Sequence, residues 1–156
     1  MVLHSALTNK SGLRPETTPY WKYQPPKVDG NENIEILWDR TAYTYKSVAH
    51  NRPDIILKDK KQRRAYLIDV AVPSPNNAQK TIYHKVEKYR ELSMELEKQW
   101  KMRIRTLPIV LTTTGAYPKA TMRNLMELGY GKAEIRAMQE ATILHVTRTV
   151  RKVLGE

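Results

Sequence analysis

The sequence contains no cysteine, which excludes disulfide bonds, thiolate catalysis and zinc sites with cysteine ligands. Only four histidines are present (His4, His50, His84 and His145), and no two of them have the spacing of a metal-binding helical pair. Any bound metal is therefore expected to be a hard ion held by carboxylates. No apolar run approaches the roughly 18 residues that a transmembrane helix requires, and residues 1–10 lack the pattern of a secretory leader. We therefore expect no membrane partner.

Acidic residues are few compared with basic ones. The 27 Lys and Arg residues exceed the 16 Asp and Glu residues, which gives a formal net charge of +11. So basic a chain of 156 residues is typical of proteins that bind a polyanion, most often nucleic acid. The 40% of hydrophobic residues are enough for a real core, and the length fits one domain.

The N-terminal segment differs in composition from the rest. Four of the nine prolines fall within residues 1–30, together with Tyr20, Trp21 and Tyr23. This composition predicts an extended arm over residues 1–30, with the aromatic side chains anchored on the body of the protein. Residues 31–156 are then expected to form the single domain.

Hydrophobic patterning in that domain predicts an α/β fold with a mixed sheet. Strands are expected at residues 33–39, 53–57, 65–72 and 105–112, and residues 41–48 form either another strand or an irregular loop. The runs at 53–57 and 65–72 form a β-hairpin or two adjacent strands, joined by a charged turn. Helices are expected at residues 78–102, at 119–128 before Gly129, and at 132–154.

Asp54 and Asp69 are the most informative residues. Asp54 begins one predicted strand, and Asp69 interrupts the apolar run of the next, on the face that carries Leu67 and Ala71. A carboxylate within an apolar strand is costly to bury unless a cation neutralises it. Either residue alone could have a structural role, Asp54 in a turn and Asp69 in a pair with an arginine. If the strands form a hairpin, however, both carboxylates can share one Mg²⁺, which favours a metal site.

At these two aspartates the sequence resembles a known family. The strings NRPDI (51–55) and LIDVAVP (67–73) resemble the PD-(D/E)XK restriction-enzyme-like endonuclease domain, in the form found at the C-terminus of site-specific non-LTR retrotransposon polyproteins after the reverse transcriptase. The similarity extends over residues 15–154. It includes the strings YWKY (20–23), LWDR (37–40), KVEKY (85–89), PIVL (108–111) and RKVL (151–154).

The resemblance implies a restriction-endonuclease-like three-layer fold, with a mixed central sheet flanked by helices. It also implies a nuclear enzyme that uses Mg²⁺ or Mn²⁺, held by Asp54 and Asp69, to nick target DNA and so prime reverse transcription. Element RNA is a further expected partner, through neighbouring domains. Position 71, where the superfamily carries its lysine, is alanine here. The lysine is expected on the following helix, where we favour Lys88, with Tyr89 beside it, over Lys85.

Further residues are expected to contribute around this site. Asp39 and Asn51 are candidates to support the metal-binding residues, whereas Glu35 is better interpreted as an exposed strand charge. Contacts with the DNA backbone are expected from the basic residues Arg52, Lys58, Lys60, Lys61, Arg63 and Arg64. Three alternatives remain open: a catalytically idle DNA-binding remnant of the same domain, a junction-resolvase-like nuclease, and a basic RNA-associated protein.

Overall fold

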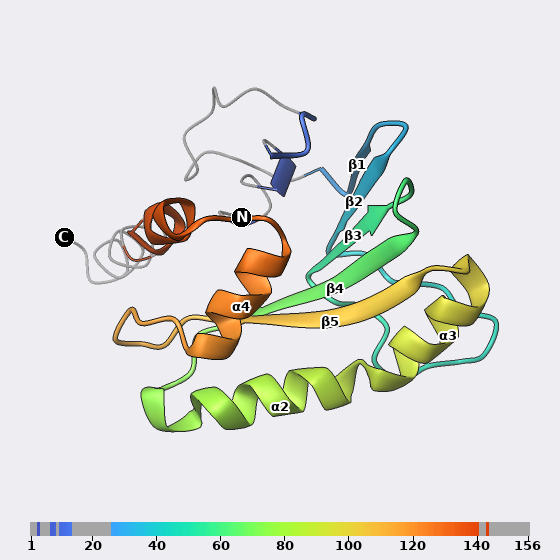
Figure 1. The fold of residues 1–156 in the computed structure, drawn as a ribbon. Coiled ribbons are helices and arrows are strands. Elements are labelled where there is room, and N and C mark those ends of the chain that lie inside the picture. The colour runs from blue at the N-terminus through green and yellow to red at the C-terminus, as the bar shows by residue number, and fades with distance from the viewer. Residues whose placement is uncertain (1–2, 4–6, 9, 14–25, 141–142, 144–156) are drawn as a thin grey trace, which may run out of the picture.

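A five-stranded mixed sheet forms the centre of the molecule in a computed structural model, which describes residues 3, 7–8, 10–13, 26–140 and 143. The strands lie side by side in chain order, and each of the first three is antiparallel to the next (Figure 1). The last strand is parallel to the fourth. The strands are β1 (Val28–Gly30), β2 (Ile34–Trp38), β3 (Ile55–Asp59), β4 (Arg64–Ala71) and β5 (Arg103–Val110). The predicted mixed sheet and α/β class are confirmed.

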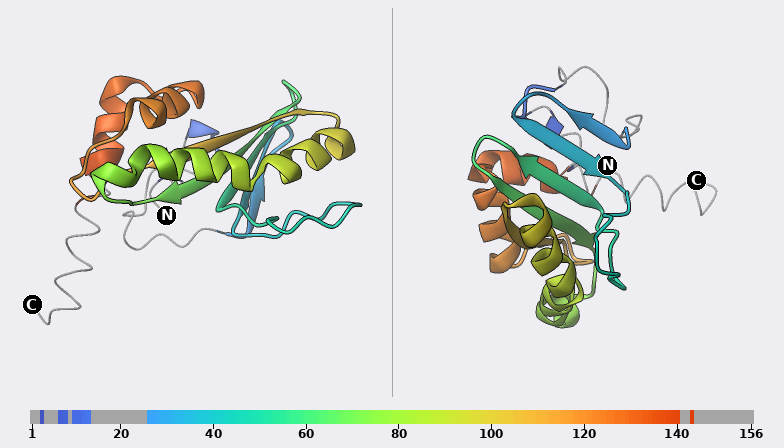
Figure 2. Two further views of the ribbon diagram at one scale, coloured as in Figure 1. Left: turned by 90° about the horizontal axis from the view of Figure 1, so that it is seen from below. Right: turned by 90° about the vertical axis from the view of Figure 1, so that its right-hand side faces the viewer.

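Helices cover both faces of this sheet. A parallel pair of strands needs a crossover connection, and here the chain between β4 and β5 forms η1 (Pro75–Asn77), α2 (Ala78–Lys88) and α3 (Arg90–Trp100). These elements lie along one face (Figures 1 and 2). Helix α4 (Lys119–Glu127) and the helical residues 132–140 lie on the other face. The result is a layered arrangement of helices, sheet and helices.

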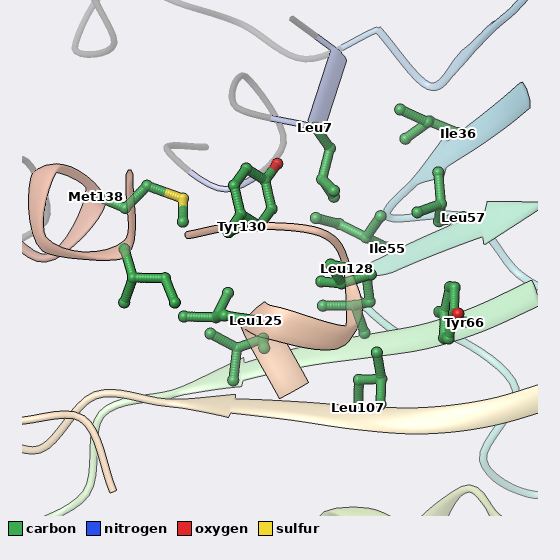
Figure 3. Close-up of a cluster of buried hydrophobic side chains, with 13 residues drawn as sticks. Leu7, Ile36, Ile55, Leu57, Tyr66, Leu107, Leu125, Leu128, Tyr130 and Met138 are labelled. Atoms are coloured by element: carbon green, nitrogen blue, oxygen red, sulfur yellow. The ribbon is translucent and has the colours of Figure 1, made fainter. Parts of the chain in front are cut away.

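The residues of β4 alternate between two separate cores. Tyr66 and Ile68 join the cluster under α4, part of which is drawn in Figure 3, whereas Ala65 and Leu67 join the cluster under α3. All four side chains are buried. The alternation predicted for this strand is therefore confirmed, and it directs Asp69 to the same face of the sheet as Leu67, toward α2 and α3.

The predicted helix over residues 78–102 is interrupted. Tyr89 separates α2 from α3, and its backbone (φ −101°, ψ 10°) leaves the helical region. Its amide is shared between the carbonyls of Glu87 and Lys85, and the hydrogen bond to Lys85 is long, at 3.4 Å. The Tyr89 side chain is buried against the sheet, so the break occurs where the helix makes a close tertiary contact.

The N-terminal segment also departs from the prediction. Leu7 and Thr8 are helical and buried, and β1 pairs with β2, so the described parts of residues 1–30 belong to the domain rather than to an extended arm. Tyr20, Trp21 and Tyr23 lie outside the described residues. Residues 41–48 form an irregular loop, which settles the alternative left open there. No helix among the described residues is long and apolar enough to cross a membrane.

Candidate active site

The β3–β4 hairpin brings Asp54 and Asp69 together. The register pairs Ile55 with Ile68, so the two aspartates face each other one step further along the ladder. The amide of Asp54 donates to Oδ1 of Asp69 at 3.3 Å, and the amide of Val70 donates to Oδ2 of Asp54 at 2.8 Å. The predicted proximity is confirmed. Each carboxylate is held by a backbone group from the other's strand, so their relative position is fixed by the sheet.

The pair is electrostatically unfavourable by itself. Burial raises the pKa of the Asp54 carboxyl, the Val70 amide opposes this effect, and the negative charge of Asp69 raises the pKa further. Asp69 is itself buried, with only 3% of its surface exposed. Two carboxylates in so close a space favour a proton or a cation between them.

Lys85 and Tyr89 contact Asp69 from α2 and its C-terminal end. The Lys85 ammonium forms an ion pair with Oδ2 of Asp69, and the Tyr89 hydroxyl donates to Oδ1 at 3.1 Å. These residues are four positions apart and therefore share one face of the helix. Burial, followed by the charge of Asp69, raises the pKa of the Tyr89 phenol. The hydroxyl therefore remains a protonated donor.

Lys88 does not reach the carboxylates. Its side chain is exposed, and its ammonium lies 5.0 Å from the centre of the Tyr89 ring. The preference for Lys88 over Lys85 was based on the pattern of the helix face. The structure instead places Lys85 beside Asp69, because the helix reaches the sheet through the Lys85–Tyr89 edge.

The carboxylate pair suits a hard divalent cation. Oδ2 of Asp69 is buried and accepts no hydrogen bond from the described residues, and its contact with Lys85 is an ion pair without hydrogen-bond geometry. No group of three or more His, Cys, Asp or Glu side chains occurs in the part of the chain that the structure describes. Mg²⁺ is commonly bound through one or two carboxylates, with substrate phosphate and water as its other ligands. Asp54 and Asp69 fit that donor set.

Asp39 and Arg52 form a second charged group, which is joined to Asp54 through the backbone. Nε and Nη2 of Arg52 lie 2.8 and 3.0 Å from the two oxygens of Asp39, and Lys27 lies 3.0 Å from one of them. Hydrogen bonds from Arg52 and then Lys27 lower the pKa of Asp39 to about 2. The Asp39 amide also donates to the carbonyl of Asp54 at 2.8 Å. Asp39 thus supports the backbone at Asp54 without touching its carboxylate.

Asn51 contributes through its backbone. Its carbonyl accepts a hydrogen bond of 2.7 Å from the amide of Ala42, which closes the loop that leads to Arg52 and Asp54. No side-chain contact of Asn51 with either aspartate is found among the described residues. Its predicted supporting role is therefore limited to the shape of this loop.

The basic residues of the hairpin lie apart from the carboxylates. From Asp54 to the turn at Lys60 the strand runs six residues, or about 20 Å at 3.3 Å per residue. Most of these side chains have intramolecular partners: Glu35 for Lys58 and Lys60, the Trp100 ring for Lys58, the Lys101 carbonyl for Arg63, and the Tyr66 ring for Arg64. Lys61 is exposed at the tip. The structure thus separates the predicted DNA-binding turn from the carboxylates, except for Arg52.

Glu35 is more than an exposed strand charge. Its side chain is 26% exposed and lies 3.2 Å from Nζ of Lys58 and 3.5 Å from Nζ of Lys60. It thus neutralises part of the positive charge at the distal end of the hairpin.

Comparisons with known proteins add little. No protein-family model matches the chain, and no curated protein matches it. Among solved structures, the chain is similar to an N-terminal domain of a reptarenavirus L protein, with a TM-score of 0.37 and 15% sequence identity. The match covers 72% of this chain and 62% of that one. The site is therefore interpreted from its own geometry.

An open groove adjoins the site on the other side of Lys85. It measures about 450 Å³ and is lined by Pro73, Ser74, Asn77, Lys80, Thr81, His84 and Lys85. The sequence analysis did not single out Lys80 or His84 as site residues. The available signal was their spacing, because Lys80 and His84, like Thr81 and Lys85, are four residues apart on one helix.

Proposed function

We propose that this protein is a metal-dependent DNA endonuclease. The observation that carries the proposal is the meeting of Asp54 and Asp69 across the β3–β4 hairpin, with the Lys85 ammonium against Asp69. Two carboxylates and one cationic side chain in a half-buried space are what metal-assisted phosphodiester hydrolysis requires.

The residues have distinct roles in this reaction. Asp54 and Asp69 would hold Mg²⁺ or Mn²⁺, which when bound polarises the scissile phosphate and lowers the pKa of a bound water. The Tyr89 hydroxyl holds Oδ1 of Asp69 and so orients its carboxylate. The Val70 amide does the same for Asp54. The Lys85 ammonium is the cation available to orient the attacking water and to stabilise the charge that develops on the phosphate.

DNA is the substrate that the charge and the resemblance favour. A net charge of +11 attracts a polyanion. The resemblance to the endonuclease of non-LTR retrotransposons supports a more specific role. In that role the enzyme acts in the nucleus and nicks one strand of target DNA, so that the liberated 3′ hydroxyl primes reverse transcription of element RNA bound by neighbouring domains.

Nicking of a supercoiled plasmid tests the proposal. We expect the wild-type chain to convert the plasmid to its open-circular form with Mg²⁺ or Mn²⁺ and not with EDTA. Asp54→Ala and Asp69→Ala should abolish nicking and leave DNA binding equal or stronger, because each removes a negative charge that repels phosphate.

The controls separate the alternatives. Full cleavage by either aspartate variant would overturn the two-carboxylate site. Binding without cleavage by the wild type would instead favour an idle DNA-binding remnant. Cleavage confined to branched substrates would favour a resolvase-like nuclease.

A further inference from the structure

The groove beside Lys85 is cationic and is linked to the carboxylates through the Lys85 side chain. Lys85 lines it and also forms the ion pair with Asp69, so one side chain belongs to both places. The lining side chains include two lysines, a histidine and two hydroxyl groups, and no acidic residue. Such a surface matches a phosphate group, whose oxygens accept hydrogen bonds and carry negative charge.

Of the two lysines that line the groove, Lys85 is paired with Asp69, whereas the charge of Lys80 is available to an anion. Lys80 is exposed and takes part in no ion pair among the described residues. Lys58 and Lys60, by comparison, are both paired with Glu35. The ammonium of Lys80 can therefore meet an anion that enters the groove.

The polar groups of the groove are available as donors. The side-chain amide of Asn77 donates to Oγ of Ser74 at 3.1 Å, which leaves the hydroxyl proton of Ser74 free to donate elsewhere. His84 is exposed and has a ring N–H donor in either protonation state. Its ring packs edge-on against Tyr83, with the two ring centres 6.2 Å apart.

The spacing along α2 sets the distance from the site of cleavage. Lys80 lies five residues before Lys85, or about 7.5 Å along the helix axis at 1.5 Å per residue. Neighbouring phosphates of one strand are about 7 Å apart, because each step combines the 3.4 Å rise along the axis of B-form DNA with a turn about it. A strand that follows the groove therefore places a second phosphate roughly one nucleotide from a phosphate held at Lys85.

We propose that the groove lined by Ser74, Lys80 and His84 binds a phosphate of the substrate strand about one nucleotide to one side of the scissile phosphate. This inference rests on the proposed nuclease function. It makes Lys80 and His84 positioning residues, which fix the register and direction of the strand across Asp54 and Asp69.

Salt dependence of DNA binding provides the first test. The double variant Lys80→Ala/His84→Ala is compared with Lys132→Ala, which removes the same single formal charge from an exposed helical position on the opposite layer. Binding of a short duplex of mixed sequence is measured with Ca²⁺ in place of Mg²⁺. The double variant should reduce the slope of log K against log salt by about 0.9, and Lys132→Ala should leave it unchanged. Equal slopes for the two variants would overturn the proposal.

Neutral phosphates locate the contact. Single methylphosphonates are introduced at each position around the cut, and cleavage is measured for the wild type and the double variant. In the wild type, apart from the scissile phosphate itself, one position about one nucleotide from the cut, on one side only, should reduce cleavage. The double variant should show no further loss at that position. A loss that persists undiminished in the variant would contradict the assignment.

The results distinguish failure of the phosphate groove from failure of the proposed nuclease function. If the wild type does not cut DNA but the slope difference is observed, the phosphate groove stands and the nuclease proposal fails. If the wild type cuts DNA and the double variant and Lys132→Ala have equal salt slopes, the nuclease proposal stands and the phosphate-binding role of the groove is refuted. A thermal unfolding midpoint equal to that of the wild type shows that each variant is folded.

Discussion

Separate substitutions of Lys85 and Lys88 test which of the two lysines supplies the catalytic cation. The helix pattern favours Lys88, whereas the structure places Lys85 beside Asp69. Both are lysines on α2, three residues apart, so Lys85→Met and Lys88→Met make the same chemical change. The Lys85 side chain is 22% exposed and its ammonium contacts Asp69, whose side chain is 5% exposed. Lys88 is exposed, and within the described part of the chain its ammonium lies over the Tyr89 ring and pairs with no carboxylate. Methionine preserves the aliphatic stem, so the comparison isolates the charge.

The expected magnitudes follow from these contacts. Loss of one electrostatic stabiliser typically lowers kcat by about 10²–10³-fold, and we expect this for Lys85→Met. Its free energy of unfolding should fall by about 1–2 kcal/mol, the lower part of the range for a buried acceptor that loses a partner. The lower part applies because water reaches Lys85, and because Tyr89 and the Asp54 amide still bind Asp69. Lys88→Met should change kcat less than about twofold and stability by less than about 1 kcal/mol.

Single-turnover nicking of a plasmid measures the rate, and urea unfolding measures the stability. Affinity for DNA, measured with Ca²⁺, should fall in Lys85→Met, which removes a cation from the phosphate groove, and change little in Lys88→Met, whose side chain is exposed outside the groove lining. A normal rate for Lys85→Met together with an inactive Lys88→Met would refute the assignment of the cation to Lys85. Normal rates in both would show that α2 supplies no catalytic cation.

The remaining predictions concern Tyr89, Asp39 and the salt response. Tyr89→Phe removes the donor to Asp69, so the free energy of unfolding measured in urea should fall by about 1–2 kcal/mol, and nicking should slow less than in Lys85→Met. Because Arg52 and Lys27 lower the pKa of Asp39 from 3.8 to about 2, its ionised form stabilises the protein above pH 3.8 and loses this effect as the pH falls toward 2. Asp39→Asn should therefore be less stable than the wild type at neutral pH, and urea unfolding at a series of pH values should show the difference closing between pH 3.8 and 2. A difference that persists unchanged at pH 2 would contradict the ion pair. DNA affinity should fall steeply with salt, and an affinity unchanged between low and physiological salt, measured by fluorescence anisotropy, would exclude a phosphate partner.

The sequence was sufficient to predict the two neighbouring strands that carry the carboxylates, and the structure shows that they form a hairpin. Two apolar runs with a charged turn between them define β3 and β4, and the period of two along β4 determines which face Asp69 occupies. Because such pairing is local in the chain, sequence could predict that Asp54 and Asp69 meet if the two strands form a hairpin. The strand at residues 105–112 was predicted as well, but its parallel pairing with β4 was not; α2 and α3 form the crossover between them.

The choice between lysines depended on tertiary structure. Residues 85, 88, 89 and 92 lie within one broad helix face, and sequence gives no rule for which edge of it meets the sheet. Tyr89 and Leu92 are buried, which turns Lys85 toward Asp69 and Lys88 toward solvent. The interruption at Tyr89 was equally invisible, because no glycine or proline marks it. Residues 28–30 were missed as a strand because their pairing with β2, rather than their own composition, makes them one.

Direct measurement of Mn²⁺ binding tests the central claim, that Asp54 and Asp69 together hold one divalent cation. Calorimetric titration of the metal-free protein should show one Mn²⁺ per chain, and Asp54→Asn and Asp69→Asn should each abolish this binding while Asp39→Asn retains it. The asparagine variants keep the shape of the side chains, so a loss reports the missing charge. Wild-type affinity for Mn²⁺ in either Asp54→Asn or Asp69→Asn would contradict the two-carboxylate site.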